Sequence, residues 1–116
     1  RTELWCTSPE AGAVLAGGVG GTGGVDYGAD LTCPAGSVMT GLHGRAGLVT
    51  FGGTVVDTLG VTCLNPQTGA AFTSPARGIA AATANPFNIS CNPGTKVIGI
   101  FGAQGGLLDR IGIVCQ

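Results

Sequence analysis

The sequence predicts an all-β domain that contains an internal duplication. Short apolar or β-branched runs recur along the chain, and glycine, proline or aspartate separates them. The only alanine-rich stretch that suits a helix, residues 78–84, is closed by Asn85 and Pro86 after seven residues. Glycine, with 23 copies, is the commonest residue and weakens helix interiors. We therefore expect helix to make up less than about a tenth of the chain, against the usual third.

The duplication is visible in the spacing of cysteine, glycine and aspartate. An offset of 58 residues relates one set to its copy: Cys33, Gly36, Gly41, Gly44 and Gly47 match Cys91, Gly94, Gly99, Gly102 and Gly105. An offset of 52 relates the closing set: Asp57, Gly60 and Cys63 match Asp109, Gly112 and Cys115. The first copy is therefore six residues longer between Gly47 and Asp57. Self-similarity of this kind indicates a fold assembled from two related units.

The repeat extends further towards the start of the chain. Residues 6–13 match residues 63–70 at an offset of 57, with Cys, Pro, Gly and Ala in the same places. One unit therefore runs over residues 6–62 and the second over 63–115, and we predict a single domain over residues 1–116.

The predicted strands follow the apolar runs in order. Residues 1–5 precede Cys6 as residues 60–62 precede Cys63, so we expect them to form the last strand of a preceding unit. Many short strands with regular turn signals are typical of a sandwich or of a barrel-like closed form. The expected strands are Thr2–Cys6, Ala11–Ala16, Ser37–Leu42, Leu48–Phe51, Thr54–Val56, Leu59–Cys63, Ala70–Thr73, Phe87–Cys91, Lys96–Phe101 and Ile111–Cys115.

Composition excludes two classes of partner. Charged residues make up 9% of the chain, against roughly 25% in a typical soluble domain, and the net charge is -1. The few basic residues do not cluster, so no nucleic acid partner is expected. No apolar run approaches the roughly 20 residues of a membrane helix, so no membrane insertion is expected.

The chain begins at Arg1 and carries an Asn88-Ile89-Ser90 sequon, which suits a processed, secreted protein.

Five cysteines indicate an oxidising compartment. In each unit one cysteine opens the second half and another ends it, which favours the pairs Cys33–Cys63 and Cys91–Cys115. Cys6 is then free, or it bonds another chain and makes a homo-oligomer. The pairing Cys6–Cys33 with Cys63–Cys91 also respects the repeat and stays open. The spacings exclude a CxxC zinc site, and we expect no metal and no cofactor.

Several of these motifs resemble known families. Residues 36–47 with 56–61 are similar to the closing segment of jacalin-related lectins, in which a Gly-Arg-Ser-Gly-like turn precedes Asp and Ile-Gly-Val. Residues 102–113 resemble the same segment, and residues 17–27 resemble the glycine-rich loop of that family. The Cys-Pro-x-Gly opening and the Asp-Thr-Leu before a closing Cys resemble vitelline membrane outer layer proteins. Both families share the β-prism I-like fold, so the resemblance implies three four-stranded antiparallel sheets around a pseudo-threefold axis.

The glycine turns that precede Asp57 and Asp109 are the candidate binding sites. A tight turn exposes backbone N–H donors beside one carboxylate, and sugar hydroxyls both donate and accept hydrogen bonds. In jacalin relatives such a Gly-x-x-x-Asp turn holds the sugar. The resemblance implies a first site of Gly105, Gly106, Leu107 and Asp109, a second of Gly53, Thr54, Val55 and Asp57, and Gly24 lining one of them. The aromatic turn residues of galactose-preferring relatives are absent, so mannose- or glucose-type glycans are expected.

Two functions follow from these residues. The first is a secreted carbohydrate-binding protein, a jacalin-like lectin, whose partners are glycans or glycoproteins. The second is a disulfide-stapled extracellular structural or coat protein without a sugar site, in which each aspartate caps its own turn. An enzyme is not expected. A pseudo-symmetric fold would place Asp57 and Asp109 in different repeats, too far apart to act as a pair of glycosidase carboxylates.

Four further residues have structural interpretations. His43 occupies a strand position and no nucleophile pattern accompanies it, so we expect a packed or surface histidine. Arg45 is expected to be a solvated turn residue. Trp5 and Phe101 are expected in the core.

Overall fold

The computed structural model describes six segments, residues 2–8, 12–19, 30–48, 53–81, 83–104 and 107–116. All the regular secondary structure within these segments is β-strand, which confirms the all-β prediction. None of these segments is an apolar helix long enough to cross a membrane. The strands are β1 (Thr2–Ser8), β2 (Gly12–Val19), β3 (Val38–Leu48), β4 (Thr54–Leu64), β5 (Ala71–Thr73), β6 (Arg77–Gly78), β7 (Asn85–Ser90), β8 (Val97–Gln104) and β9 (Leu108–Cys115).

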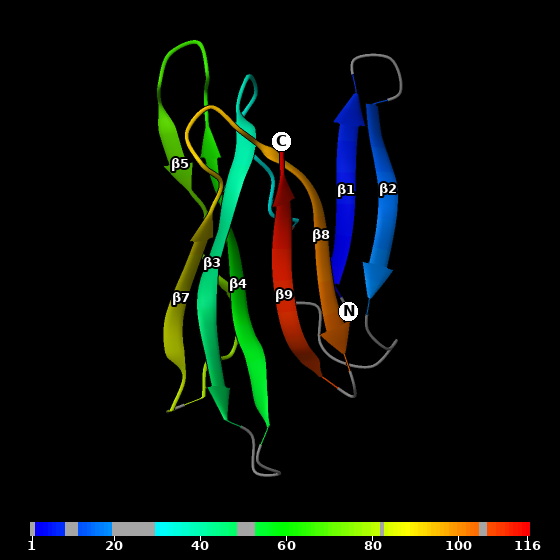
Figure 1. Ribbon diagram of the computed structural model, residues 1–116, viewed down its shortest axis with the longest axis vertical. Coiled ribbons are helices and arrows are strands. Elements are labelled where there is room, and N and C mark those ends of the chain that lie inside the picture. Colours follow the sequence, from blue (N-terminus) through cyan, green and yellow to red (C-terminus); the bar gives the residue numbers. More distant parts are fainter. Residues whose placement is uncertain (1, 9–11, 20–29, 49–52, 82, 105–106) are drawn as a thin grey trace.

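The strands form three antiparallel sheets (Figure 1). The largest has five strands in the order β5-β4-β3-β7, with β6 also paired to β4, and it curls into a half-barrel. The β1–β2 and β8–β9 hairpins form sheets of two strands each. In Figure 1, β8–β9 lies between the large sheet and β1–β2, and β9 packs against β4. Strands β3, β4 and β5 follow one another and β7 returns beside β3, which is the Greek key order.

Two of the long strands were each expected as separate short ones. The predicted strands Ser37–Leu42 and Leu48–Phe51 were interrupted at glycine-rich residues, but β3 runs unbroken through residues 43–47. Likewise Thr54–Val56 and Leu59–Cys63 were divided at Asp57, but β4 continues through it. A residue that breaks the pairing register forms a β-bulge, which bends a strand without ending it. A bulge therefore explains the misleading turn signal at Asp57, whereas the bulge of β3 lies at Thr40, outside residues 43–47.

The β3–β4 and β8–β9 hairpins carry the same irregularities at equivalent positions. In β3–β4 the register shifts past Thr40 and past Asp57, leaving each residue bulged out of the ladder. In β8–β9 the bulged residues are Ile98 and Asp109. These residues are related by the offsets of 58 and 52 that relate the two sequence copies. The two hairpins are therefore structural copies of one another.

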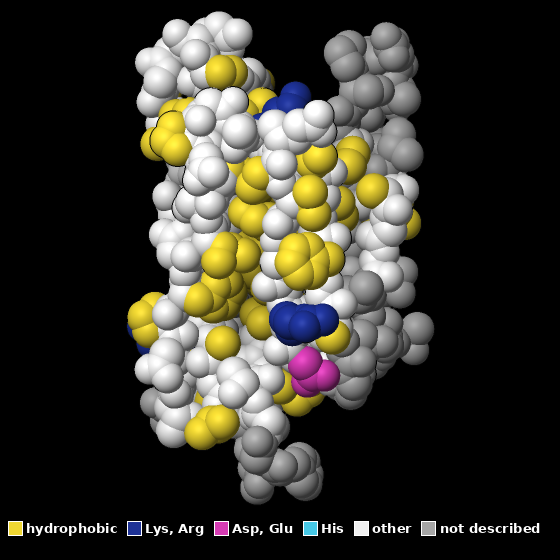
Figure 2. All heavy atoms as spheres, in the orientation of Figure 1, with side chains coloured by type: hydrophobic (Ala, Val, Ile, Leu, Met, Phe, Trp, Pro, Cys, Tyr) yellow, Lys and Arg dark blue, Asp and Glu magenta, His cyan; other side chains and the backbone are white. Residues whose placement is uncertain are grey.

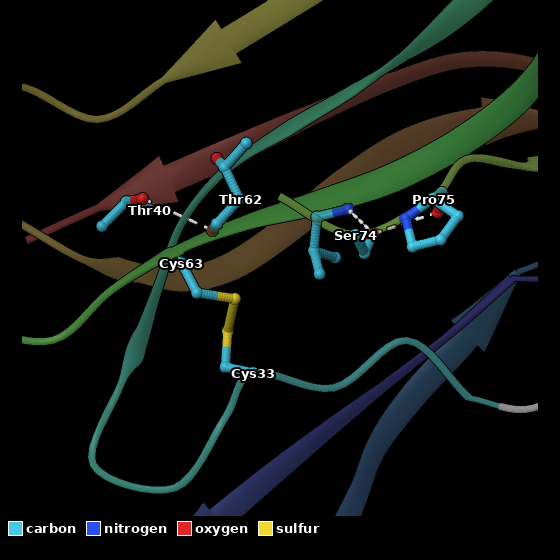
Figure 3. Close-up of a disulfide and its surroundings, with 7 residues drawn as sticks. Cys33, Thr40, Thr62, Cys63, Ser74 and Pro75 are labelled. Carbon is cyan, nitrogen blue, oxygen red and sulfur yellow. Dashed lines mark hydrogen bonds between the residues drawn. A yellow bond between two sulfur atoms is a disulfide. The ribbon is translucent and has the colours of Figure 1, made fainter. Parts of the chain in front are cut away.

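Each hairpin is fastened by one disulfide, as predicted. Cys33 bonds Cys63 and Cys91 bonds Cys115, with a Cα–Cα distance of 5.7 Å in both. Each bond joins the loop before a hairpin to the last strand of that hairpin, as the close-up of Cys33 and Cys63 shows (Figure 3). Cys6 is free and exposed. This arrangement rules out the alternative pairing of Cys6 with Cys33.

The turn after each opening cysteine is also repeated. The Ser37 amide donates to the carbonyl of Pro34 at 3.0 Å, and the Thr95 amide donates to that of Asn92 at 3.1 Å. Gly36 and Gly94 sit at the third position of these turns with φ angles of 79° and 83°. A type II turn requires such a positive φ at its third position, which favours glycine there.

The core lies between the large sheet and the β8–β9 hairpin. Its buried centre is Leu42, Val61 and Cys63. The partly buried apolar side chains packed around this centre are Leu31, Cys33, Met39, Leu59, Ile89, Ile111 and Ile113. The buried disulfide sulfur of Cys63 therefore contributes to packing as well as to cross-linking.

Trp5 and Phe101 lie outside this core, so the expectation that both are buried is wrong. Their exposed fractions are 52% and 54%. Strand β9 turns Ile111 and Ile113 towards the core, and side chains alternate between the faces of a strand. Phe101 pairs with Gly112, which lies between those two isoleucines in sequence, so its side chain belongs to the opposite face.

Candidate functional site

Asp57, the carboxylate of the second predicted site, already has a backbone partner. It is half-buried, and its Oδ2 accepts a hydrogen bond from the Ala81 amide at 3.3 Å. A Cβ added at Gly47 would lie 2.9 Å from the same oxygen and 3.0 Å from the Cα of Ala84. The carboxylate is therefore directed at the segment between β6 and β7.

The other residues of this predicted site are arranged as a strand and not as a turn. Gly53 directly precedes β4, and Thr54 and Val55 pair with Leu48 and Gly47 in the β3–β4 ladder. Thr54 is exposed, whereas Val55 is only 5% exposed. An extended backbone cannot curl its N–H groups around the Asp57 carboxylate as the predicted turn would.

The first predicted site is described only in part. Gly105, Gly106 and Gly24 lie outside the described residues. Leu107 is 57% exposed, and Asp109 is exposed as the bulged residue of β9. Within the part of the chain that the structure describes, the Asp109 carboxylate has no hydrogen-bond or ion-pair partner, unlike that of Asp57.

An exposed aromatic ring and a guanidinium share the outer face of this hairpin. Phe101 pairs with Gly112 and Ala103 with Arg110, so Phe101 and Arg110 lie two residues apart along the same face. A Cβ at Gly112 would collide with the Phe101 ring, which shows that the ring lies across β9 at that point. Figure 2 shows hydrophobic, basic and acidic side chains exposed close together over β8 and β9. Asp109 directly precedes Arg110 in the sequence.

The equivalent face of β3–β4 carries polar groups. The His43 ring lies over Gly60 as Phe101 lies over Gly112. The Nε2 atom of His43 is 2.9 Å from the carbonyl oxygen of Ser74. Because a carbonyl only accepts, Nε2 carries the hydrogen of this bond. His43 is half-buried, in agreement with a packed histidine.

Arg45 belongs to the same face, and its predicted turn position is wrong. It lies within β3 opposite Thr58, whose Oγ1 accepts from the Arg45 amide at 2.9 Å. Its side chain is exposed, and Nη1 donates to the carbonyl of Ala84 at 3.3 Å. The flanking glycines suggested a turn, but in a paired strand they only mark a close approach of neighbouring backbones.

Sequence reasoning missed Phe101 and Arg110 as surface groups of β8–β9, and it placed the exposed Arg45 in a turn instead of in β3. The available signal was the alternation from Phe101 to Ala103 and from Arg110 to Gly112, which becomes informative once Asp109 is known to be a bulge.

The described residues hold no group of three or more His, Cys, Asp or Glu that could bind a metal ion. No protein-family model and no curated protein matches this chain. The resemblance to jacalin-related lectins therefore stays a prediction.

Proposed function

We propose that this chain is a secreted carbohydrate-binding protein that holds a neutral hexose of the mannose or glucose type on the outer face of β8–β9. One observation supports this most directly. Asp109 is an exposed carboxylate without a partner in the described residues, and it lies beside exposed Arg110 on a hairpin whose outer face carries exposed Phe101.

The three side chains are complementary to a sugar. A carboxylate accepts hydrogen bonds from two adjacent hydroxyls, and a guanidinium donates to hydroxyl oxygens. The Phe101 ring presents an apolar surface on which the C–H face of a hexose can pack. The ring lies over Gly112, which has no side chain to displace it. The amide of Leu107, directly before β9, is a further candidate donor.

The proposal includes a β-prism arrangement of the three sheets. Its support is the Greek key order of β5, β4, β3 and β7 within the five-stranded sheet, which resembles the four-stranded unit that the family resemblance implies. A crystal structure of the whole chain in which β3–β4 and β8–β9 belong to equivalent four-stranded sheets about a threefold axis would establish it. Sheets that no such axis relates would refute it.

The two disulfides are compatible with an extracellular protein. Secretion is part of the proposal, and non-reducing peptide mapping of protein from the growth medium tests it. Recovery of the Cys33–Cys63 and Cys91–Cys115 peptides from secreted material is the expected result. Protein found only inside cells with reduced cysteines would contradict it.

The bond from Ala81 to Asp57 favours a second candidate function. In an extracellular structural or coat protein, the repeated aspartates would hold neighbouring backbone in place, as Asp57 does. This alternative predicts that the wild-type protein binds no hexose and that replacing either aspartate affects only stability.

Calorimetric titration with mannose and with glucose separates the two functions. In Asp109→Asn, one acceptor oxygen becomes a donor amide, so we expect the affinity to fall about tenfold to a hundredfold. Phe101→Ala should weaken binding as well, because it removes the apolar platform. Asp57→Asn is the matched control, and its affinity should stay within about twofold of wild type. No heat from the wild-type protein with any common hexose would leave the structural function standing.

A further inference from the structure

A groove of about 610 Å³ lies on the large sheet, away from the β8–β9 hairpin. Its lining comes from β3, β4, β5 and β7 and includes His43, Arg45, Thr62, Thr73, Phe87 and Asn88. The volume lies within the range of about 300 to 1,000 Å³ that is typical of small-molecule sites. Strands β5 and β7, which pair with β4 and β3, contribute walls of this groove. Neither β8 nor β9 pairs with a further strand among the described residues.

Arg45 is the one Lys, Arg, Asp or Glu side chain in the lining that the described residues form. A guanidinium has five N–H donors, and the described residues accept only one of them, at the Ala84 carbonyl. Among the described residues, no Asp or Glu side chain lines the groove. The remaining donors of Arg45 therefore suit an anionic group on a ligand, and a planar carboxylate matches their forked geometry.

The other polar groups form a mixed set of donors and acceptors. Because Nε2 of His43 donates to the Ser74 carbonyl, Nδ1 can accept a hydrogen bond when it carries no hydrogen. The hydroxyls of Thr62 and Thr73 have no partner in the described part of the chain and can both donate and accept. Asn88 accepts from the Ser90 hydroxyl at 3.3 Å through Oδ1, which leaves its amide N–H groups to donate.

The Phe87 ring does not lie beside these groups, although Phe87 belongs to the lining between Pro86 and Asn88. Phe87 pairs with Gly44, and its Cζ would lie 3.1 Å from a Cβ added there, so the ring shares the face of Gly44 and Leu42. His43 and Arg45 alternate with those residues and belong to the opposite face. The groove therefore offers one guanidinium with several hydroxyl and amide groups, and a molecule with one carboxylate and several hydroxyls is complementary to this set.

We propose that this groove binds an acidic saccharide, whose carboxylate bonds Arg45 and whose hydroxyls bond His43, Thr62 and Thr73. This site differs from the Asp109 face in its sheet, its charge and its ligand. It depends on neither the neutral-hexose proposal nor the Asp109 carboxylate, so either site can fail while the other stands.

Titration with trigalacturonate, a saccharide with one carboxylate on each sugar, tests the proposal. The protein should be produced in bacteria, because Asn88 lies in a sequon and must be unmodified. Wild type should bind, and Arg45→Gln should weaken binding about tenfold to a hundredfold. Arg77→Gln is the matched control, since Arg77 is an exposed arginine of β6 that does not line the groove. Its affinity should stay within about twofold.

Two further measurements make the result decisive. The methyl ester of trigalacturonate keeps the hydroxyls and removes the charge, so it should bind wild type about as weakly as the acid binds Arg45→Gln. Arg45→Lys keeps the charge without the fork and should bind between the two, and thermal melts show whether each variant folds. Equal losses in Arg45→Gln and Arg77→Gln, equal binding of acid and ester, no binding by wild type, or loss of binding in Asp109→Asn would each overturn the proposal.

Discussion

The β3–β4 and β8–β9 hairpins have the same turn, bulges and disulfide. Among the described residues, further strands are hydrogen-bonded only to β3–β4, here called the covered hairpin, and β8–β9 is called the open one. Strand β7 pairs with β3, and β5 and β6 pair with β4, whereas β8 and β9 pair only with each other among the described residues. Val55 is 5% exposed, but its counterpart Leu107 is 57% exposed. The surroundings of a repeated hairpin, and not its own geometry, therefore decide which of its side chains are available for binding.

The side chains at equivalent positions differ in a consistent way. Thr40, His43 and Thr62 of the covered hairpin correspond to Ile98, Phe101 and Val114 of the open one. These apolar side chains are 48%, 54% and 46% exposed, and Figure 2 shows hydrophobic side chains gathered over β8 and β9. Apolar groups kept together on an exposed face indicate an interaction surface. The covered hairpin instead presents polar groups to a groove.

The largest difference that we expect between the hairpins concerns their disulfides. The bonds span 30 and 24 residues, so each should contribute about 3 to 4 kcal/mol on the loop-entropy model. Cys63 is also 2% exposed within the core, so its loss leaves a cavity. Urea unfolding should show a larger loss of stability in the double variant Cys33→Ala/Cys63→Ala than in Cys91→Ala/Cys115→Ala. Equal losses of stability would mean that the burial of Cys63 adds nothing to the contribution of its disulfide.

Val55 and Leu107 test the covered and open environments directly. Val55→Ala removes buried methyl groups and should lower the free energy of unfolding by about 1.5 to 3 kcal/mol. Leu107→Ala should change it by less than about 0.5 kcal/mol, because that side chain is already in water. Chemical denaturation of both variants provides the measurement. A large loss in Leu107→Ala would show that the open hairpin is covered in solution.

We expect a smaller difference in stability from substituting Gly60, which lies under the His43 ring, and Gly112, which lies under the Phe101 ring. A Cβ at Gly60 collides with His43, which is held by Ser74, whereas a Cβ at Gly112 collides with Phe101, whose other side is open. Gly60→Ala should therefore cost about 1 to 2 kcal/mol, since the His43 bond must break. We expect Gly112→Ala to cost about half as much and to weaken hexose binding at the same time. Thermal melts with calorimetry distinguish these outcomes, and a reversed order would contradict the comparison.

The sequence predicted the parts of this fold that depend on local pattern. The all-β class and both disulfides follow from strand periodicity and from the repeated spacing of cysteines. Strand ends near Asp57 were wrong because a bulge and a turn have the same residue types, and pairing with a neighbouring strand decides between them. Phe101 was misplaced for a similar reason: its exposure depends on whether another strand covers β8–β9, which no residue of that hairpin encodes.

The candidate sites divide in the same way. The position of Asp109 next to a glycine-rich turn was readable from the repeat, but its grouping with Phe101 and Arg110 required the register of β8 and β9. The groove around Arg45 was not predictable, because its walls come from four strands that are distant in sequence. Local repeats reveal which residues are equivalent, and tertiary packing decides which of them have free polar groups.

The smallest expected difference is between the two aspartates, and stability measures it better than binding does. Asp57→Ala removes the acceptor of the Ala81 amide. That amide belongs to an exposed residue and can bond water instead, so the loss should be only about 0.5 to 1 kcal/mol. Asp109→Ala removes a carboxylate that has no partner in the described residues and should change stability by less than about 0.5 kcal/mol in either direction.

Both aspartate variants should be unfolded in urea beside wild type, with and without saturating mannose. Without sugar, only Asp57→Ala should be measurably less stable. With sugar, wild type and Asp57→Ala should each gain stability, because a ligand that binds only the folded state shifts the equilibrium towards it. Asp109→Ala should gain almost nothing. If both variants lose stability equally and neither responds to sugar, the two aspartates have the same structural role, and the difference between the covered and the open hairpin does not extend to their carboxylates.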